Sequence, residues 1–256
     1  LYGDITHQSM TTIGATDTRS IKLDKFSISD YKLDFGLQYT YKLNKKNTIN
    51  IGAVYTLGRT LHGDAYKYHQ TGAESNGSIY VQSQTGDTIP NPFKMPHTFG
   101  IGLTYVYDNR LTIGVDYTLQ KWNTADLAWS KFNKESVEMN SRTKIAFGAE
   151  FVPSYISHNY LKRIRYRMGA YYSSPYNKVS YTSPDTGTTS FQDGAREYGV
   201  SIGFGLPMFQ SKSMLNISGQ YIKVSPKFKG LMEENYLRIN IGLTFNERWF
   251  MKWKVD

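Results

Sequence analysis

The 256-residue chain contains no cysteine, which excludes a disulfide framework and a thiolate metal site. It also lacks a long apolar segment. No run approaches the roughly 18 residues of a membrane helix, and the densest one, from Ile145 to Val152, is interrupted by Gly148 and Glu150. The mean hydropathy is low, at -0.49. These features exclude a helical membrane protein but not a membrane β-barrel, in which alternation of residues dilutes the mean hydropathy.

Motifs of catalysis and of cofactor binding are also absent from the sequence. The five histidines, His7, His62, His69, His97 and His158, are isolated and show no metal-ligand spacing. No nucleophile elbow, Walker loop or dinucleotide fingerprint occurs. We therefore predict that the protein is not an enzyme and needs no cofactor, and we assign no catalytic or metal-binding residue.

The segment from Phe99 to Trp122 predicts two alternating strands joined by a turn at 108–110. Every second residue is large and apolar, and the residues between them are small or polar. Strict alternation is the period of a strand whose two faces meet different surroundings. An apolar face opposite a small, polar one is typical of a barrel in a lipid bilayer, whose polar face turns to the interior.

By the same criteria the sequence predicts about ten strands. They are one strand within Tyr2–Ile13, then Asp30–Leu43, Thr48–Arg59, the two strands of 99–122, Arg142–Val152, Ile164–Ser173, Glu197–Leu206, Met214–Val224 and Asn235–Phe245. Short connections at 44–47, 108–110, 153–163 and 207–213 alternate with long polar ones at 60–96, 123–141, 174–196 and 225–234. This sorting is typical of an outer-membrane barrel. We predict a single transmembrane antiparallel up-and-down β-barrel domain over residues 1–256, in a bacterial outer membrane.

The excess of positive charge is consistent with that location. The net charge is +9, and a basic chain can bind nucleic acid. Here, however, the basic residues are scattered through loops and polar strand faces and form no stripe. We expect no nucleic acid partner. We expect contact with outer-membrane lipid and lipopolysaccharide at the barrel rims, with a merely solvated surface as the alternative.

Charged residues within the predicted strands fall at the polar positions of the alternating pattern, and we predict that they face the lumen. The candidates are Asp34, Asp116, Lys144, Glu150, Arg165, Arg167, Glu197 and Arg238. They either pair with one another or form a selectivity filter or substrate anchor. Glycine recurs on the same face. Glycine weakens a strand, so its recurrence indicates either relief of crowding and sheet curvature or close packing of a plug or a ligand.

Three tryptophans lie near the ends of predicted strands. Trp122 follows the strand that ends before the long connection 123–141, and Trp249 and Trp253 follow the last strand. Tryptophan concentrates at membrane–water interfaces and forms girdles at both barrel rims. We predict that these three residues lie at the membrane interface.

The segment from Met95 to Trp122 resembles the FadL-type family of outer-membrane transporters of hydrophobic compounds such as long-chain fatty acids. The shared pattern is a Pro entering a Gly-rich strand, a short turn, a strand with Asp and Tyr, and a Trp at its end. Further similarity lies in IRYRMGAYYSSPY (164–176), REYGVSIGFGLPM (196–208) and NYLRINIGLTF (235–245). The resemblance covers about residues 95 to 245.

This resemblance implies a fourteen-stranded barrel with an N-terminal plug and a lateral opening in its wall. Since about ten strands are visible, we expect the other strands and the plug in a part preceding Leu1. The chain also departs from many outer-membrane barrels by continuing past Phe245. The expected function is passive transport of fatty-acid-like molecules across the outer membrane. The alternatives are a FadL-like structural subunit of an outer-membrane secretion or assembly complex, with other outer-membrane proteins as partners, and a polar-solute porin.

Overall fold

The computed structural model describes residues 2–12, 18–75, 78–125, 138–182, 188–208, 213–227 and 232–245. Its contacts divide the chain into two compact units. The first unit comprises Leu1–Asp34, Thr56–Thr98 and Lys121–Met139, and the second comprises Phe35–Tyr55, Phe99–Gln120 and Asn140–Asp256. The prediction of a single barrel domain over residues 1–256 stays a prediction.

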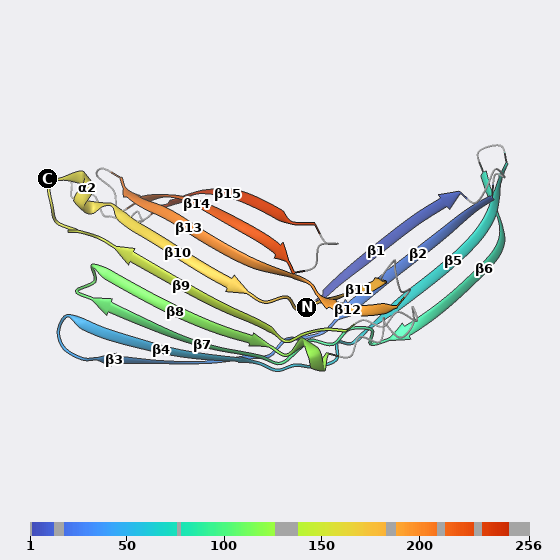
Figure 1. The fold of residues 1–256 in the computed structure, drawn as a ribbon, viewed down its shortest axis with the longest axis horizontal. Coiled ribbons are helices and arrows are strands. Elements are labelled where there is room, and N and C mark those ends of the chain that lie inside the picture. Colours follow the sequence, from blue (N-terminus) through green and yellow to red (C-terminus); the bar gives the residue numbers. More distant parts are fainter. Residues whose placement is uncertain are drawn as a thin grey trace, which may run out of the picture. The chain divides into compact units, whose positions relative to one another are not determined.

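The second unit is built on a nine-stranded sheet (Figure 1). Its strands are β3 (Asp34–Lys42), β4 (Asn47–Thr56), β7 (Thr98–Tyr107), β8 (Leu111–Gln120), β9 (Arg142–Phe151), β10 (Arg165–Ser173), β13 (Ala195–Pro207), β14 (Met214–Pro226) and β15 (Glu234–Thr244). Spatial order follows chain order, from β3 at one edge to β15 at the other. Each corresponds to one strand predicted from the sequence, which confirms the all-β antiparallel fold.

Register gives this sheet two distinct faces. From β8 to β13, Leu111, Phe151, Tyr166 and Phe204 form one cross-strand row, and Val115, Phe147, Ala170 and Val200 form another. We call this side the apolar face. The intervening residues, such as Glu150 beside Arg167 and Gly148 beside Gly169, form the polar face. The alternation in sequence is thus carried across the sheet, because neighbouring strands pair in phase.

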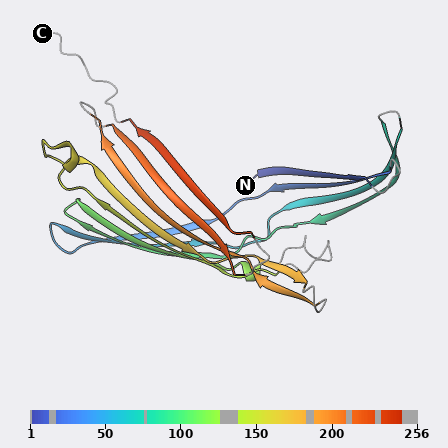
Figure 2. The same cartoon turned by 45° about the horizontal axis from the view of Figure 1, so that its top comes forward.

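The first unit contains a four-stranded antiparallel sheet in the order β1-β2-β5-β6 (Figure 2). Its strands are β1 (Tyr2–Thr12), β2 (Thr18–Ser29), β5 (Gly63–Ser75) and β6 (Ser78–Pro90), and a short 3₁₀ helix, η1, spans Trp122–Thr124. The second unit also holds the hairpin of β11 (Lys178–Thr182) and β12 (Thr189–Asp193) and the one-turn helix α2 (Tyr160–Arg163). Among the described residues, no helix is both long and apolar enough to cross a membrane.

Two predictions from the sequence are corrected by these elements. The described residues form fifteen strands rather than about ten. The segment 60–96, predicted as one long loop, contains β5 and β6, and the predicted loop 174–196 contains β11 and β12. β5 and β6 were missed because their Gly, Ser, Thr and Gln content indicated a loop, and β11 and β12 are only five residues long. The fifth additional strand, β2, lies between the predicted strands Tyr2–Ile13 and Asp30–Leu43.

The chain passes from one sheet to the other at 30–33, 57–62 and 91–97. These three segments pair with each other: Leu57 N–H donates to Leu33 O (3.0 Å), and Arg59 and Met95 exchange two backbone hydrogen bonds. Asn91 adopts a positive φ of 51°, which supports a sharp change of direction. Leu61, Ala65 and Pro92 are buried here, so the base of the four-stranded sheet has a small core of its own.

Candidate functional site: the polar face of the nine-stranded sheet

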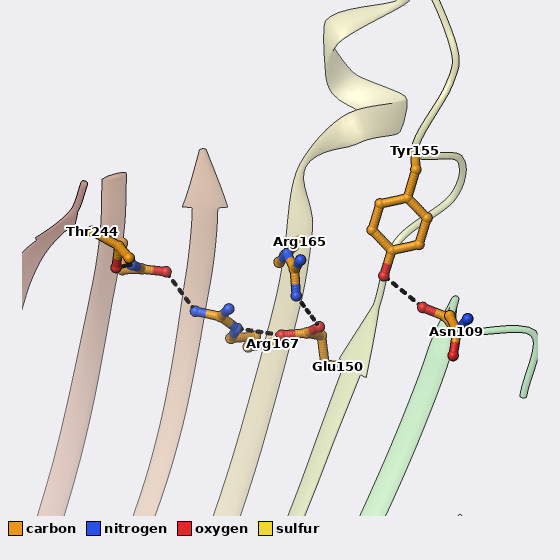
Figure 3. Close-up of polar contacts among 7 residues, drawn as sticks. Asn109, Glu150, Tyr155, Arg165, Arg167 and Thr244 are labelled. Carbon is orange, nitrogen blue, oxygen red and sulfur yellow. Dashed lines mark hydrogen bonds and ion pairs between the residues drawn. The ribbon is translucent and has the colours of Figure 1, made fainter. Parts of the chain in front are cut away.

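A chain of polar contacts crosses the polar face near the short-turn ends of the strands (Figure 3). Glu150 on β9 accepts hydrogen bonds from Arg165 Nη1 at 3.0 Å and Arg167 Nε at 2.6 Å. Arg167 Nη1 reaches Asn216 on β14 at 2.7 Å, and Asn216 contacts Thr244 on β15 at 3.4 Å. Charge-assisted bonds of this kind are stronger than neutral ones. The chain therefore links four strands through side chains as well as through the backbone.

Glycines on β13 make room for this chain of contacts. Arg167 on β10 reaches β14 by passing over β13, where its pairing partner is Gly203. A Cβ built on Gly203 would lie 3.2 Å from Ser218 Cβ and 3.6 Å from Arg167 Cβ, and one on Gly205 would lie 3.1 Å from Arg165 Cβ. A side chain at either position would crowd the path of the arginines, so here glycine serves close packing.

A second polar cluster lies on the same face toward the opposite ends of these strands. The Tyr171 hydroxyl donates to Glu197 at 2.5 Å, and the Lys144 ammonium lies 4.8 Å from the centre of the Tyr171 ring. The ring covers Gly199, where an added Cβ would be 2.0 Å from Tyr171 Cε1. Arg142 Nε donates to Ser173 at 2.8 Å. This cluster connects β9, β10 and β13.

Among the other predicted lumen residues, Asp34 and Asp116 lie apart from these two groups, and Arg238 lies within electrostatic range of Tyr171 in the second. Asp34, at the start of β3, forms an ion pair with Lys32 at 2.8 Å and accepts from the Thr56 hydroxyl at 2.5 Å. Asp116 on β8 lies against Gly102, where an added Cβ would be 2.4 Å from its carboxylate. Arg238 on β15 is paired in register with Gln220. The eight candidates thus form two groups, with Arg238 close to the second, and two separate positions.

The predicted interface tryptophans are only partly described. Trp122 begins η1 directly after β8 and is half-buried. Trp249 and Trp253 lie outside the described residues. Sequence reasoning missed Asn216, Thr244 and Tyr171, because it considered only charged side chains. All three occupy polar-face positions of the alternating pattern, and that signal would have identified them.

Glycines of the polar face fall into two classes. Beside Gly148 and Gly242 a Cβ would meet nothing within 4 Å, whereas Gly169, Gly199 and Gly205 are closely covered by side chains of neighbouring strands. The covered glycines are explained by packing within the sheet. The open ones leave free surface on the polar face.

Depressions differ in chemistry between the two faces. On the polar face, one of about 410 Å³ is lined by Gln38, Asn50, Thr104 and Asp116 with several glycines, and one of about 300 Å³ by Arg167, Ser201, Asn216, Ser218 and Asn240. On the apolar face, one of about 340 Å³ is lined mainly by Phe151, Tyr166, Met168, Ile202 and Phe204. In the described part of the chain, no group of acidic, His or Cys side chains is arranged to hold a metal ion.

The first unit holds a buried carboxylate that sequence reasoning did not single out. The Asp30 side chain is 1% exposed and accepts from the backbone N–H groups of His62 (2.8 Å) and Tyr31 (2.7 Å). His62 Nδ1 and Arg59 Nη1 lie 3.1 and 3.4 Å from the carboxylate. The hydrogen bond from the His62 backbone leads the interactions that lower the pKa of Asp30 to about 2. Asp30 thereby ties segment 30–33 to segment 57–62.

Comparison with known families identifies the family to which the chain belongs. A family model named BamG matches residues 1–256, which is the whole sequence. The chain belongs to the BamG family. BamG is an outer-membrane family related to the BAM complex, and the protein is accordingly an outer-membrane β-barrel protein of bacteria. No curated protein matches the chain.

Among solved structures, the CymD monoaromatic hydrocarbon channel is similar to this chain at 13% sequence identity and a TM-score of 0.43. The match covers 88% of this chain and 74% of that one. The resemblance to the FadL-type family stays a prediction.

Proposed function

We propose that this BamG-family protein is a structural subunit of an outer-membrane protein assembly complex related to BAM. Its partners would be other outer-membrane proteins, and its barrel wall would serve as a rigid membrane-embedded element. Family membership over the whole sequence is the first support for this role.

The chemistry of the polar face is the structural observation that favours a subunit over a transporter. A passive carrier of hydrophobic molecules needs an apolar pocket on its ligand path. The described polar face instead carries Glu150 paired with two arginines, and its depressions combine amide, hydroxyl and charged side chains with glycines and some aliphatic residues. The apolar depressions lie on the opposite face. Cross-strand ion pairs stiffen a wall and do not solvate an acyl chain.

Passive transport of hydrophobic molecules is the second candidate, and the open glycines favour it. The space beside Gly148 and Gly242 leaves room on the polar face for an elongated molecule. Each methylene of an acyl chain buried there would gain about 0.8 kcal/mol.

The two candidates separate in one experiment on the tagged full-length protein, extracted from its own membranes in mild detergent. A subunit co-purifies with outer-membrane proteins in fixed stoichiometry, and native mass spectrometry gives the composition. A transporter carries a lipid-like small molecule and no stoichiometric protein partner, and that result would overturn the subunit proposal.

Variants that fill the open surface sharpen this test. Gly148→Trp and Gly242→Trp each place a large ring where the polar face is open. For a subunit, partner recovery and the amount of folded outer-membrane proteins in the cell stay at the wild-type level. For a transporter, the same variants abolish uptake of a labelled fatty acid by cells that depend on this protein.

A further inference from the structure

The apolar depression of the nine-stranded sheet owes its shape to one small residue. Along β9, Ala149 lies between Phe147 and Phe151 on the apolar face, and its pairing partners are Ile113 and Met168. The missing side-chain volume at Ala149 leaves a hollow of about 340 Å³ framed by Phe151, Tyr166, Met168 and Phe204. The hollow lies at the short-turn end of the sheet, because Phe151 and Tyr166 form the row closest to the turn between β9 and β10.

The turn from 152 to 164 is folded against its surroundings rather than extended freely. Ser154 N–H donates to Lys162 O (2.8 Å), and the Tyr155 hydroxyl donates to Asn109 O in the β7–β8 turn (2.5 Å; Figure 3). The Tyr166 hydroxyl, which belongs to the wall of the hollow, donates to Leu161 O at 3.0 Å. The turn is therefore held next to the hollow.

This ordered turn presents apolar and basic side chains together. Ile156 is 93% exposed and Leu161 is 62% exposed. Lys162 and Arg163 lie in the last turn of α2. The adjacent short turns add Lys45, Lys46 and Arg110, and Asp108 N–H donates to Lys46 O at 2.6 Å, so these turns are neighbours. In the described residues of these three turns the only acidic side chain is Asp108.

We propose that the hollow and the β9–β10 turn together bind an anionic phospholipid of the periplasmic leaflet. The hollow takes an acyl chain, Ile156 and Leu161 enter the headgroup region, and Lys162 and Arg163 attract the phosphate and its neighbours. Short turns of outer-membrane barrels lie on the periplasmic side, where the leaflet is made of phospholipid. Aromatic and basic side chains at this depth are the residues that hold a lipid headgroup. This inference rests on the membrane location and not on the proposed subunit role.

Two pairs of variants test the site in full-length protein reconstituted into nanodiscs of equal parts phosphatidylglycerol and phosphatidylethanolamine. Ala149→Leu fills the hollow from the apolar face, and its control, Ala170→Leu, adds the same volume on the exposed part of that face outside the hollow. Lys162→Gln with Arg163→Gln removes the turn's charges, and its control, Lys22→Gln with Lys25→Gln, removes two exposed charges from the four-stranded sheet.

Native mass spectrometry after release from the nanodisc counts the retained lipids. We expect wild type and both controls to keep phosphatidylglycerol in preference to phosphatidylethanolamine. Removal of Lys162 and of Arg163 lowers retention by about five-fold each, and Ala149→Leu loses the bound lipid while the unfolding midpoint by circular dichroism stays at the wild-type value. Equal retention in all variants would overturn the proposal. So would preferential retention of lipopolysaccharide when it is added, or an equal loss in Ala170→Leu.

Discussion

The nine-stranded and four-stranded sheets exchange the chain three times between β2 and β7. Only the nine-stranded sheet, however, has an apolar face along its whole length. In the four-stranded sheet, Ile5, Phe26, Ala65 and Ile89 form one apolar cross-strand row. The next row on the same face is His7, Asp24, Lys67 and Asp87. Within the four-stranded sheet this apolar row is therefore followed directly by a row of charged and polar residues.

This difference shows what each sheet uses for stability. A continuous apolar face exposed over nine strands is stable only against lipid. The four-stranded sheet relies on the small core at its base and on ordered polar contacts such as those of Asp30. We infer that the end of the apolar face marks the boundary of the membrane-embedded part of the chain.

A charge on each sheet gives the largest expected contrast. Val200→Arg puts a guanidinium in the middle of β13 on the apolar face, where a charge facing lipid costs about 2–4 kcal/mol. Met10→Arg adds the same charge at a half-exposed position of β1 and should change stability by less than about 0.5 kcal/mol. Denaturant unfolding of protein in liposomes measures both. Similar losses would break the distinction between the sheets.

Glycines covered by a tyrosine ring occur in both sheets and allow a closer comparison. A Cβ at Gly199 would be 2.0 Å from Tyr171 Cε1, whereas one at Gly86 would be 3.0 Å from Tyr68 Cε1. Gly199→Ala should cost about 1–3 kcal/mol, because the Tyr171 ring must leave Glu197. Gly86→Ala requires only a small ring shift and should cost less than half as much. The reverse order in unfolding experiments would contradict the packing described for Tyr171.

The Glu150 pairs should contribute more than an exposed ion pair of the same unit. Glu150→Gln leaves Arg165 and Arg167 without their carboxylate, and the expected loss is about 1 kcal/mol, because the side chains are about a quarter to a third exposed. Glu233→Gln breaks the pair with Lys223, whose side chains are almost half-exposed, and should cost less than about 0.5 kcal/mol. Equal values would mean that the chain of contacts across β9, β10 and β14 adds nothing to stability.

The smallest expected effect is the pH dependence of the four-stranded sheet. Since the folded pKa of Asp30 is about 2, below the ordinary value of 3.8 for an aspartate, its contribution is fully present above about pH 4. It is lost as the pH falls from about 4 through 2. Asp30→Asn should be less stable than wild type at pH 7, and the difference should shrink in that window. Parallel urea titrations from pH 7 to about 2 measure it, and a difference independent of pH would exclude this role for the carboxylate.

Sequence alone predicted the nine-stranded sheet well and the four-stranded sheet poorly, for one physical reason. Alternation along 99–122 reflects lipid on one face and a polar interior on the other, and every strand of the nine-stranded sheet carries this pattern. In β5 and β6 the apolar pair of Ala65 and Ile89 is followed on the same face by Lys67 and Asp87, so these strands lack a continuous alternation, and their residues were predicted as a loop.

The sequence predicted which face of the sheet carries the candidate site residues, but not which of these residues contact one another. Glu150, Arg165 and Arg167 share a face by counting alone, but their meeting depends on the register of β9 with β10 and on Gly203 in β13. The Asp30 contacts depend on a pairing between segments about 30 residues apart. Neither register nor that pairing can be obtained from the strand pattern.

The central claim is that the nine-stranded sheet turns its apolar face to lipid, and β15 tests it most directly. Because the chain has no cysteine, single spin labels can be placed along 237–243 and in β2, and their accessibility to oxygen and to a water-soluble nickel chelate compared in liposomes. We predict high oxygen and low nickel accessibility at Leu237, Ile239, Ile241 and Leu243, the reverse at Asn240 and Gly242, and nickel accessibility at exposed positions of β2. Nickel accessibility at Ile239 and Ile241 equal to that at Asn240 would contradict the account.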